Sequence, residues 1–306
     1  MSAHNQFLRK IRLLVGNDTD GIDLSNLHIV FSITQAELET PQSATIRIYN
    51  MAPDTVQKIK LNAYIRVVLE AGYQHGSYGV IFDGEIVRAR LGRESAVDTY
   101  LDILAAEGFS ANQAVVNQTL AAGATLQDTA DAAAGPMGRS IKYYNYTPSA
   151  KLPRGQALYG MSRDVLHQAA ATAGYSYFYE NGQISWVALE GFKDSEIVVL
   201  NSATGMVGWP EQTEEGVSVQ CLMNPLLEVG SRLKIDNASI LAAAYATDIR
   251  FIAGNIPSLN ADGMYRIFRI EHHGNTRGNE WYSSIIALSI DQADSRLTTL
   301  VQKGQY

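Results

Sequence analysis

The segment YRIFRIEHHGNTRGNEWYSSIIALSI, Tyr265 to Ile290, carries the most informative pattern in this 306-residue chain. Apolar and polar residues alternate on both sides of the central GNTRGN, and a period of two residues is typical of strands with one buried face. Glycine, asparagine and threonine in the centre favour a turn. The segment therefore predicts a β-hairpin, with one strand before GNTRGN and one after it.

The same segment contains two adjacent histidines, His272 and His273, between Glu271 and Glu280. Neighbouring side chains of a strand point to opposite faces, so the two imidazoles could not bind one metal ion. The glutamates also lack the i,i+4 helical spacing of the familiar zinc motif. The pattern favours a structural hairpin over a metal or catalytic site, and we predict no metal ligand in this chain.

The composition is globular, with 46% hydrophobic and 18% charged residues. The net charge is −7 and no dense Lys/Arg run occurs, which argues against a protein that grips nucleic acid by its phosphates. No apolar run approaches the roughly 20 residues that a membrane-spanning helix needs. The single cysteine, Cys221, excludes an internal disulfide framework, and its context VSVQCLMNP predicts a buried strand position.

The order of predicted elements indicates three segments. Short strands dominate residues 1–108, with a helix opening at Pro53. Residues 109–197 contain a helix capped by Thr125, a second helix from Ser162 to Gly174 and an Asn-Gly hairpin turn. Strands return in residues 198–306. We predict an α+β fold, mainly β, in which a β domain is split by an α+β insertion or two similar β domains flank one.

The familiar catalytic motifs are absent: there is no G-x-S-x-G elbow, no Walker A loop and no dinucleotide-binding glycine motif after a strand. The acidic pairs Glu214 with Glu215 and Asp98 with Asp102 have the residue types of a glycosidase, but such pairs are common on an acidic surface. His167 is predicted on a half-buried helix face. The tyrosine-rich middle of the chain suits sugar or protein binding, and core packing explains it equally well.

Three groups of residues, in order along the chain, resemble one protein family. The first is ATIRIYNMAPDTVQKIK, followed by the strand IFDGEIVRAR, and the second is ATLQDTADAAA, followed by a helix and the Asn-Gly hairpin. The third combines GMVGWPEQTEEGVSVQCLMNPLLEVGSRLKID with the hairpin at Tyr265. Together they resemble the baseplate hub proteins of contractile phage tails, relatives of the tube-like part of the type VI secretion spike.

The third group is the most specific part of the resemblance. It combines an Asn-Pro pair, a glycine before a basic strand and a hairpin whose turn ends in a tryptophan. Asn275 stands where the family pattern has Asp, and both residue types close an Asx-turn. The resemblance implies structural rather than catalytic roles at the matching positions, which are Asn224, Pro225, Gly230, Tyr265, His272, Gly274, Thr276, Arg277, Gly278 and Trp281.

The resemblance also implies an assembly. Each subunit would carry two tail-tube-like β-barrel domains with a small α+β module inserted between them, and a homotrimer would match a hexameric tail tube. The implied partners are the tail tube protein, a spike protein made as a separate chain, other baseplate proteins and the tape measure protein. DNA would pass through an acidic lumen without specific binding, with Asp98, Glu214 and Glu215 as candidates for its lining.

On this interpretation the protein is made in the host cytoplasm and resides in the virion, in the phage tail baseplate. It catalyses no reaction, needs no cofactor and contacts no membrane. Two alternatives remain open at this stage: a cell-wall hydrolase or sugar-binding tail-tip protein with its site in the tyrosine-rich middle, and the hub of a flexible-tailed phage or of a phage-derived injection device.

Overall fold

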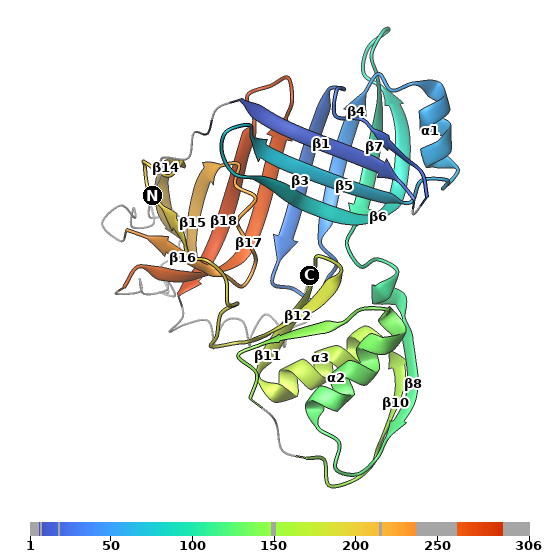
Figure 1. The fold of residues 1–306 in the computed structure, drawn as a ribbon, viewed down its shortest axis with the longest axis vertical. Helices are drawn as coiled ribbons and strands as arrows, with labels where there is room; N and C mark the ends of the chain where they lie inside the picture. Colours follow the sequence, from blue (N-terminus) through green and yellow to red (C-terminus); the bar gives the residue numbers. More distant parts are fainter. Residues whose placement is uncertain are drawn as a thin grey trace, which may run out of the picture.

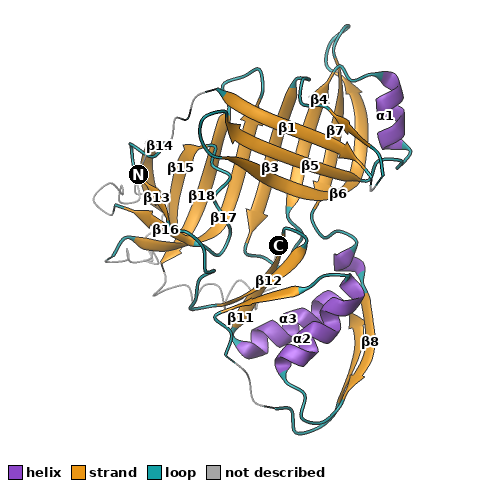
Figure 2. Ribbon diagram, viewed as in Figure 1, coloured by secondary structure: helices purple, strands orange, loops and turns teal. Residues whose placement is uncertain are grey.

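The computed structural model describes residues 6, 8–17, 19–147, 151–213, 216–236 and 262–289. This part of the chain is mainly β. Strands from the first and last thirds lie together, and the α+β module of the middle third lies beside them (Figure 1). Figure 2 shows that the two longest helices belong to this module. None of the described helices has the length and apolar character needed to cross a membrane.

The secondary-structure elements fall into three groups along the sequence. The first third contains β1 (Arg9–Gly16), β2 (Gly21–Asp23), β3 (Ile29–Ala36), β4 (Ser43–Tyr49), α1 (Pro53–Lys60), β5 (Arg66–Tyr73), β6 (Tyr78–Arg93) and β7 (Thr99–Ala106). The middle contains β8 (Val115–Leu120), α2 (Leu126–Ala134), β9 (Ile141–Tyr144), β10 (Gln156–Met161), α3 (Ser162–Ala173), β11 (Tyr175–Glu180) and β12 (Gln183–Ala188), with short 3-10 turns at Ala111–Gln113 and Gly135–Met137. The last third contains β13 (Val198–Leu200), β14 (Met206–Thr213), β15 (Gly216–Leu222), β16 (Arg232–Ile235), β17 (Met264–Asn275) and β18 (Trp281–Ser289).

One sheet contains the strands of both outer thirds. Its main path is β14-β15-β18-β17-β3-β4-β7-β6-β5-β1-β2, while β16 pairs with β17 and β13 with β16. β17 makes the connection because it has two partners on one edge: residues Met264–Arg266 pair with β16, and residues Arg269–Asn275 pair with β3. The two β regions of the sequence are therefore continuous through backbone hydrogen bonds.

The first β region folds over on itself at β6. Residues Tyr78–Glu85 of this strand pair with β5, and residues Glu85–Arg93 pair with β7. Gly84 lies at the corner, where an added Cβ would come within 2.6 Å of the Phe82 ring and 2.9 Å of the Ala106 backbone. The folded sheet encloses a large apolar core that includes Leu13, Ile33, Ile46, Leu69 and Ile103.

The described strands follow an open path that ends at β14 and β2. The predicted class, mainly β with an α+β module, is confirmed. Closure of each β region into a barrel stays a prediction, because neither region closes on itself within the described strands.

The middle module packs its helices on a three-stranded sheet, β11-β12-β9, and a two-stranded ribbon, β10-β8, completes it. Both faces of β11 and β12 are buried. One face contributes Tyr177 and Trp186 to the module's own core, and the other contributes Phe178 and Val187 to the core of the last third. The hairpin is thus the layer through which the module attaches to the β regions.

Several local predictions are confirmed. α1 buries Val56 and Ile59, and Thr125 and Asp128 form a full capping box at α2. Asn181 and Gly182 adopt positive φ angles of 50° and 75° in the hairpin turn, as an Asn-Gly turn requires. The cap of α3 differs from expectation: Met161 is the N-cap and makes no side-chain bond, while Ser162 is the first helical residue.

Candidate functional site

The hairpin β17–β18 from the last third docks on the first β region. In its turn, Asn275 accepts hydrogen bonds from the backbone N–H groups of Arg277 and Gly278 at 3.0 and 2.9 Å, which closes an Asx-turn, and its Oδ1 lies 2.9 Å from His28 Nε2. Thr276 Oγ1 accepts from the backbone N–H of Ile29 at 3.0 Å. The turn is therefore bonded to the start of β3.

An arginine from β1 binds the other side of this turn. Arg9 donates to the carbonyl oxygens of Gly278 at 2.6 Å and Asn279 at 2.9 Å, and its guanidinium lies 5.5 Å from the Trp281 ring centroid. The buried Trp281 ring meets Phe31 edge-on at 5.7 Å. This contact places an aromatic residue of the last third inside the core of the first.

Gly274 and His272 fit the same interface. A Cβ on Gly274 would lie 2.2 Å from the Phe31 ring, so a side chain there would collide with the core. His272 is 1% exposed and its Nδ1 lies 2.8 Å from Ser283 Oγ. Burial, with a smaller contribution from the charge of His273, lowers the pKa of His272 to about 3. Its imidazole is therefore neutral, which suits a packing residue.

The two histidines point to opposite faces, as the strand pattern predicted. His273 lies on the outer face beside Tyr282, with 5.1 Å between ring centroids. Among the described residues, no three His, Cys, Asp or Glu side chains are grouped in a way that could hold a metal ion.

The remaining motif positions lie at the same junction. Met223 is fully buried in the first core, and Asn224 Oδ1 accepts from the backbone N–H of Leu226 at 3.0 Å. Pro225 approaches Gly79 of β6, where an added Cβ would lie 3.5 Å from the proline Cβ. Gly230 adopts a φ of 76° and donates its N–H to the carbonyl of Ile267 at 2.8 Å. Tyr265 is buried in the second core.

At the centre of the molecule, a buried ion pair joins all three thirds of the chain. Arg266 of β17 donates two hydrogen bonds to Glu37, one of them 2.8 Å long from Nε, and the two side chains are 1% and 0% exposed. Ser176 of β11 donates to the same carboxylate. Glu37 directly follows β3 in the first third. Its carboxylate therefore accepts hydrogen bonds from Arg266 of the last third and from Ser176 of the module.

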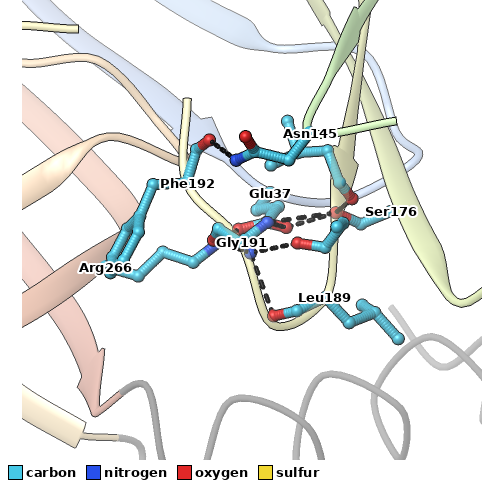
Figure 3. A network of polar contacts seen from close by, with 9 residues as sticks. Glu37, Asn145, Ser176, Leu189, Gly191, Phe192 and Arg266 are labelled. Atoms are coloured by element: carbon cyan, nitrogen blue, oxygen red, sulfur yellow. Dashed lines mark hydrogen bonds and ion pairs between the residues drawn. The ribbon is translucent and has the colours of Figure 1, made fainter. Parts of the chain in front are cut away.

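The third guanidinium nitrogen of Arg266 binds the loop that leaves the module. Its Nη1 donates to the carbonyl oxygens of Ala188 at 2.6 Å, Leu189 at 3.0 Å and Gly191 at 2.6 Å. Asn145 holds the next residue of this loop, Phe192, through a 2.7 Å hydrogen bond to its carbonyl. Figure 3 shows Glu37, Ser176 and the loop carbonyls converging on the Arg266 side chain.

Three further polar contacts attach the module. Lys193, 3% exposed, bonds Glu180 at 2.5 Å and Glu228 at 2.8 Å, and Gln42 donates to the carbonyl of Tyr179 at 2.6 Å. His167 Nδ1 lies 2.6 Å from Glu39 Oε2, so this helix histidine has its partner in the loop after β3. Burial raises the pKa of Glu39 above its ordinary value. The charged groups are paired across the contact, as burial requires.

Glu107 binds the turn of the β11–β12 hairpin. It follows β7, is 5% exposed, and accepts the backbone N–H of Gly182 at 2.8 Å. Burial raises its pKa to about 7, with Glu180 and Asp83 raising it further and Gly182 and Arg139 lowering it. These carboxylates line a small polar cavity of about 70 Å³ together with Gln42 and Glu228.

The other residues proposed from the sequence are not brought together into a reactive site. Asp102 forms an ion pair with Arg47 at 2.7 Å, and Asp98 accepts from Asn50 and Ser95. Glu214 and Glu215 lie outside the described residues. Three of the seven tyrosines of residues 109–197 are interior: Tyr175, Tyr177 and Tyr179 are all at most 7% exposed, whereas Tyr159 is 82% exposed. Cys221 is buried in β15, as predicted, and burial raises its thiol pKa to about 12.

Comparison with known proteins identifies the family of this chain. A family model described as baseplate hub gp41 matches residues 11–246, a span that includes nearly all of the first β region and the whole module and that ends before the β17–β18 hairpin. The chain belongs to the baseplate hub gp41 family. This confirms the hub resemblance, and the family is that of a structural component of the phage baseplate. No curated protein sequence matches the chain.

Solved structures support the same fold for this baseplate hub protein. The 43 kDa tail protein of prophage MuSo2 from Shewanella oneidensis superposes with a TM-score of 0.61 at 8% identity, covering 92% of this chain and 99% of that one. The tail protein from Neisseria meningitidis MC58 gives 0.58 at 10%, covering 92% and 97%. The E. coli c3393 protein, a component of the type VI secretion system, gives 0.55 at 12%, covering 92% and 76%.

Neither the Arg266–Glu37 pair nor the Glu107 contact was found from the sequence. The sequence did contain a sign of the first. Arg266 and Arg269 are three residues apart, and in a regular strand residues at this spacing lie on opposite faces, so the two arginines interrupt the alternation of polar and apolar residues. The structure resolves this conflict with a bulge at Phe268, which puts Arg266 on the same face as Arg269, opposite the second core. The loop after β12 covers Arg266 on that face.

Replacing Gly274 by Ala tests the hairpin interface. The added methyl would lie 2.2 Å from the buried Phe31 ring, which packs against Trp281. It should therefore lower the free energy of unfolding by about 1–3 kcal/mol, measured by chemical denaturation. Gly135→Ala is the matched control, since nothing lies within 4 Å of its Cβ position. Equal stability of the two variants would contradict the interface described.

Replacing Arg266 by Met tests the buried junction. The substitution strands the Glu37 carboxylate in the interior, and it should cost about 3–5 kcal/mol of stability. The double variant Glu37→Leu with Arg266→Met should recover part of this loss, because neither charge is left unpaired. Arg47→Met removes a half-exposed pair and should cost about 1 kcal/mol or less. A double variant no more stable than Arg266→Met would count against the junction.

The Glu107 contact predicts a pH dependence. The pKa of Glu107 is about 7 in the folded protein and 4.5 for the free side chain. The contribution of the protonated Glu107 to folding stability is therefore complete below pH 4.5 and is lost as pH rises through 7. The wild type should lose roughly 3 kcal/mol over this window relative to Glu107→Gln, whose amide does not titrate. Parallel stability curves for the two proteins, measured by denaturation at stepped pH, would refute the assignment.

Proposed function

We propose that the protein is a homotrimeric adaptor that joins the hexameric tail tube to the central spike and the surrounding baseplate proteins. The observation that carries this proposal is the single sheet running through both outer thirds of the chain. A subunit with two β regions in one fixed orientation, repeated three times, offers six similar units to a six-fold ring. Membership in the baseplate hub family supports the same role.

The proposed subunit has three units: residues 1–108 and 198–306 as tube-like domains, and residues 109–197 as the module. The ten motif positions act as structural residues, and those of the hairpin turn hold the hairpin on the first unit. The module is attached by buried polar contacts and stands to the side of the β regions (Figure 1), which leaves it available to other baseplate proteins.

The proposed mechanism is mechanical, with no reaction catalysed and no cofactor. Tail tube protein stacks on one rim of the ring, the spike closes the other, and the tape measure protein and then DNA pass through the lumen. A net charge of −7 suits a channel that must not retain phosphates. The protein acts in the virion, in the phage tail baseplate, after synthesis in the host cytoplasm.

Light scattering of the purified protein tests the proposal. A mass of three chains is expected, together with binding of the separately produced spike protein of the same phage to the trimer. A strict monomer at high protein concentration that cleaves peptidoglycan would overturn the adaptor and favour the hydrolase alternative. The Arg266→Met variant is a control for stability. It weakens the buried junction inside one subunit, so trimer formation should fall only as far as the fraction of folded protein falls.

A further inference from the structure

The small polar cavity beside Glu107 lies where all three thirds of the chain meet. It has a volume of about 70 Å³, and its walls come from β3, β6, the loops after β3 and β7, the β11–β12 turn, the segment between β15 and β16, and β17. Val80 and Asn181 belong to the walls and are exposed, so small molecules can reach the cavity. A ligand bound here would contact the module and both β regions.

Four carboxylates line this cavity, those of Asp83, Glu107, Glu180 and Glu228. Three of them have a cationic partner: Arg66 donates two hydrogen bonds to Asp83, and Lys193 is shared by Glu180 and Glu228. Glu107 accepts only the backbone N–H of Gly182 and has no cation in hydrogen-bond contact within the described part of the chain. Ionisation of Glu107 therefore leaves the cavity with an excess of negative charge.

Gln42 provides an observation that is independent of these charges. Its side chain lines the same cavity, is 4% exposed, and donates from Nε2 to the carbonyl of Tyr179 at 2.6 Å. That bond fixes the orientation of the amide. The other amide atom, Oε1, is buried and receives no hydrogen bond from any described residue. A buried acceptor without a donor is unfavourable, so the cavity favours a ligand that carries its own N–H or O–H groups.

The unused acceptors indicate which kind of cation fits. Gln42 Oε1, Glu107 Oε2 and Glu228 Oε1 accept no hydrogen bond from the described residues. Three acceptors equal in number the three N–H donors of a primary ammonium group. A metal ion fits less well, because no three His, Cys, Asp or Glu side chains in the described ranges are grouped to hold one. A cation with N–H donors would satisfy both the charge and the amide oxygen.

We propose that this cavity binds a primary ammonium group, carried either by a small free amine or by a lysine side chain of another protein. The ammonium lies between Glu107 and Gln42, and the attached alkyl chain leaves past Val80, which is 47% exposed. Bound in this way, the ligand connects the module with both β regions. The proposal does not depend on the trimer, because every wall of the cavity belongs to one subunit.

Binding is coupled to the protonation of Glu107. Burial raises the pKa of this carboxyl to about 7, while an alkylammonium, like a lysine side chain, keeps its charge up to a pKa of about 10. The charged or titratable groups around Glu107 are Asp83, Glu180, Glu228, Lys193, Arg139 and His272. His272 stays neutral, because burial lowers its pKa to about 3. The affinity for the amine should therefore be highest above pH 7 and fall by about tenfold for each pH unit below it.

Saturation-transfer NMR at pH 8 and constant ionic strength tests the proposal on the full-length protein. The probes are methylammonium and Nα-acetyl-lysine methylamide, and tetramethylammonium is the control because it has the same charge without an N–H group. Both primary ammonium probes should bind and tetramethylammonium should not. Equal dissociation constants for the two probes favour a free amine as the source. Binding of the lysine derivative at least tenfold more tightly favours a lysine side chain.

Two variants identify the binding groups. Glu107→Gln and Gln42→Leu should each raise the dissociation constant by about 10-fold or more, because each removes one acceptor of the ammonium. Glu107→Gln should also abolish the pH dependence of binding between pH 6 and 8, which a structural role of Glu107 would not predict. Asp102→Asn is the matched control: Asp102 is paired with Arg47 and does not line the cavity, so binding should not change. Circular dichroism verifies that each variant is folded.

The possible results separate this proposal from the proposed function. Absence of binding by both primary ammonium probes, binding of tetramethylammonium with the same affinity, or unchanged binding by folded Glu107→Gln would each overturn the ammonium site. None of these results bears on the trimer, and a monomeric wild type that binds methylammonium through Glu107 would overturn the adaptor while supporting the site.

Discussion

The Arg266–Glu37 ion pair is the interaction on which the arrangement of the three parts depends. A buried charge is tolerated only when its partners surround it, and here the groups come from the residue after β3, from β17, from β11 and from the loop after β12. Moving any one part away would leave a charge, a hydroxyl or three carbonyl oxygens without a bond in the interior. The pair therefore favours one relative position of the module and the β regions. Apolar packing is less directional and distinguishes less sharply between neighbouring positions.

Local features were largely predictable from the sequence, because they depend on residues close together in the chain. The alternation around GNTRGN predicts the hairpin, Pro53 the start of α1, and Thr125 with Asp128 the capping box. Even the opposite orientation of His272 and His273 follows from strand geometry. The family resemblance, carried by three groups of residues along the chain, placed the protein among baseplate hubs, and the family match over residues 11–246 confirms it.

The contacts between distant segments were not predictable in this way. Glu37 and Arg266 are 229 positions apart, and His167 and Glu39 are 128 apart, so no spacing rule connects them. The run YSYFYE gives no alternation because β11 is buried on both faces, with Tyr177 in one core and Phe178 in another. Asp102 and the tyrosines of β11 suggested chemistry, and an ion pair with Arg47 and burial account for them instead.

The two-partner edge of β17 also determines how the molecule bears load. The start of this strand pairs with β16 and the rest of it pairs with β3, and the contact with β3 extends over residues 269–275. A pull along the strand direction would have to shear this whole row of backbone hydrogen bonds at once, because an antiparallel ladder loaded lengthwise cannot open one bond at a time. Along this axis, the two β regions are joined as stiffly as the interior of a single sheet.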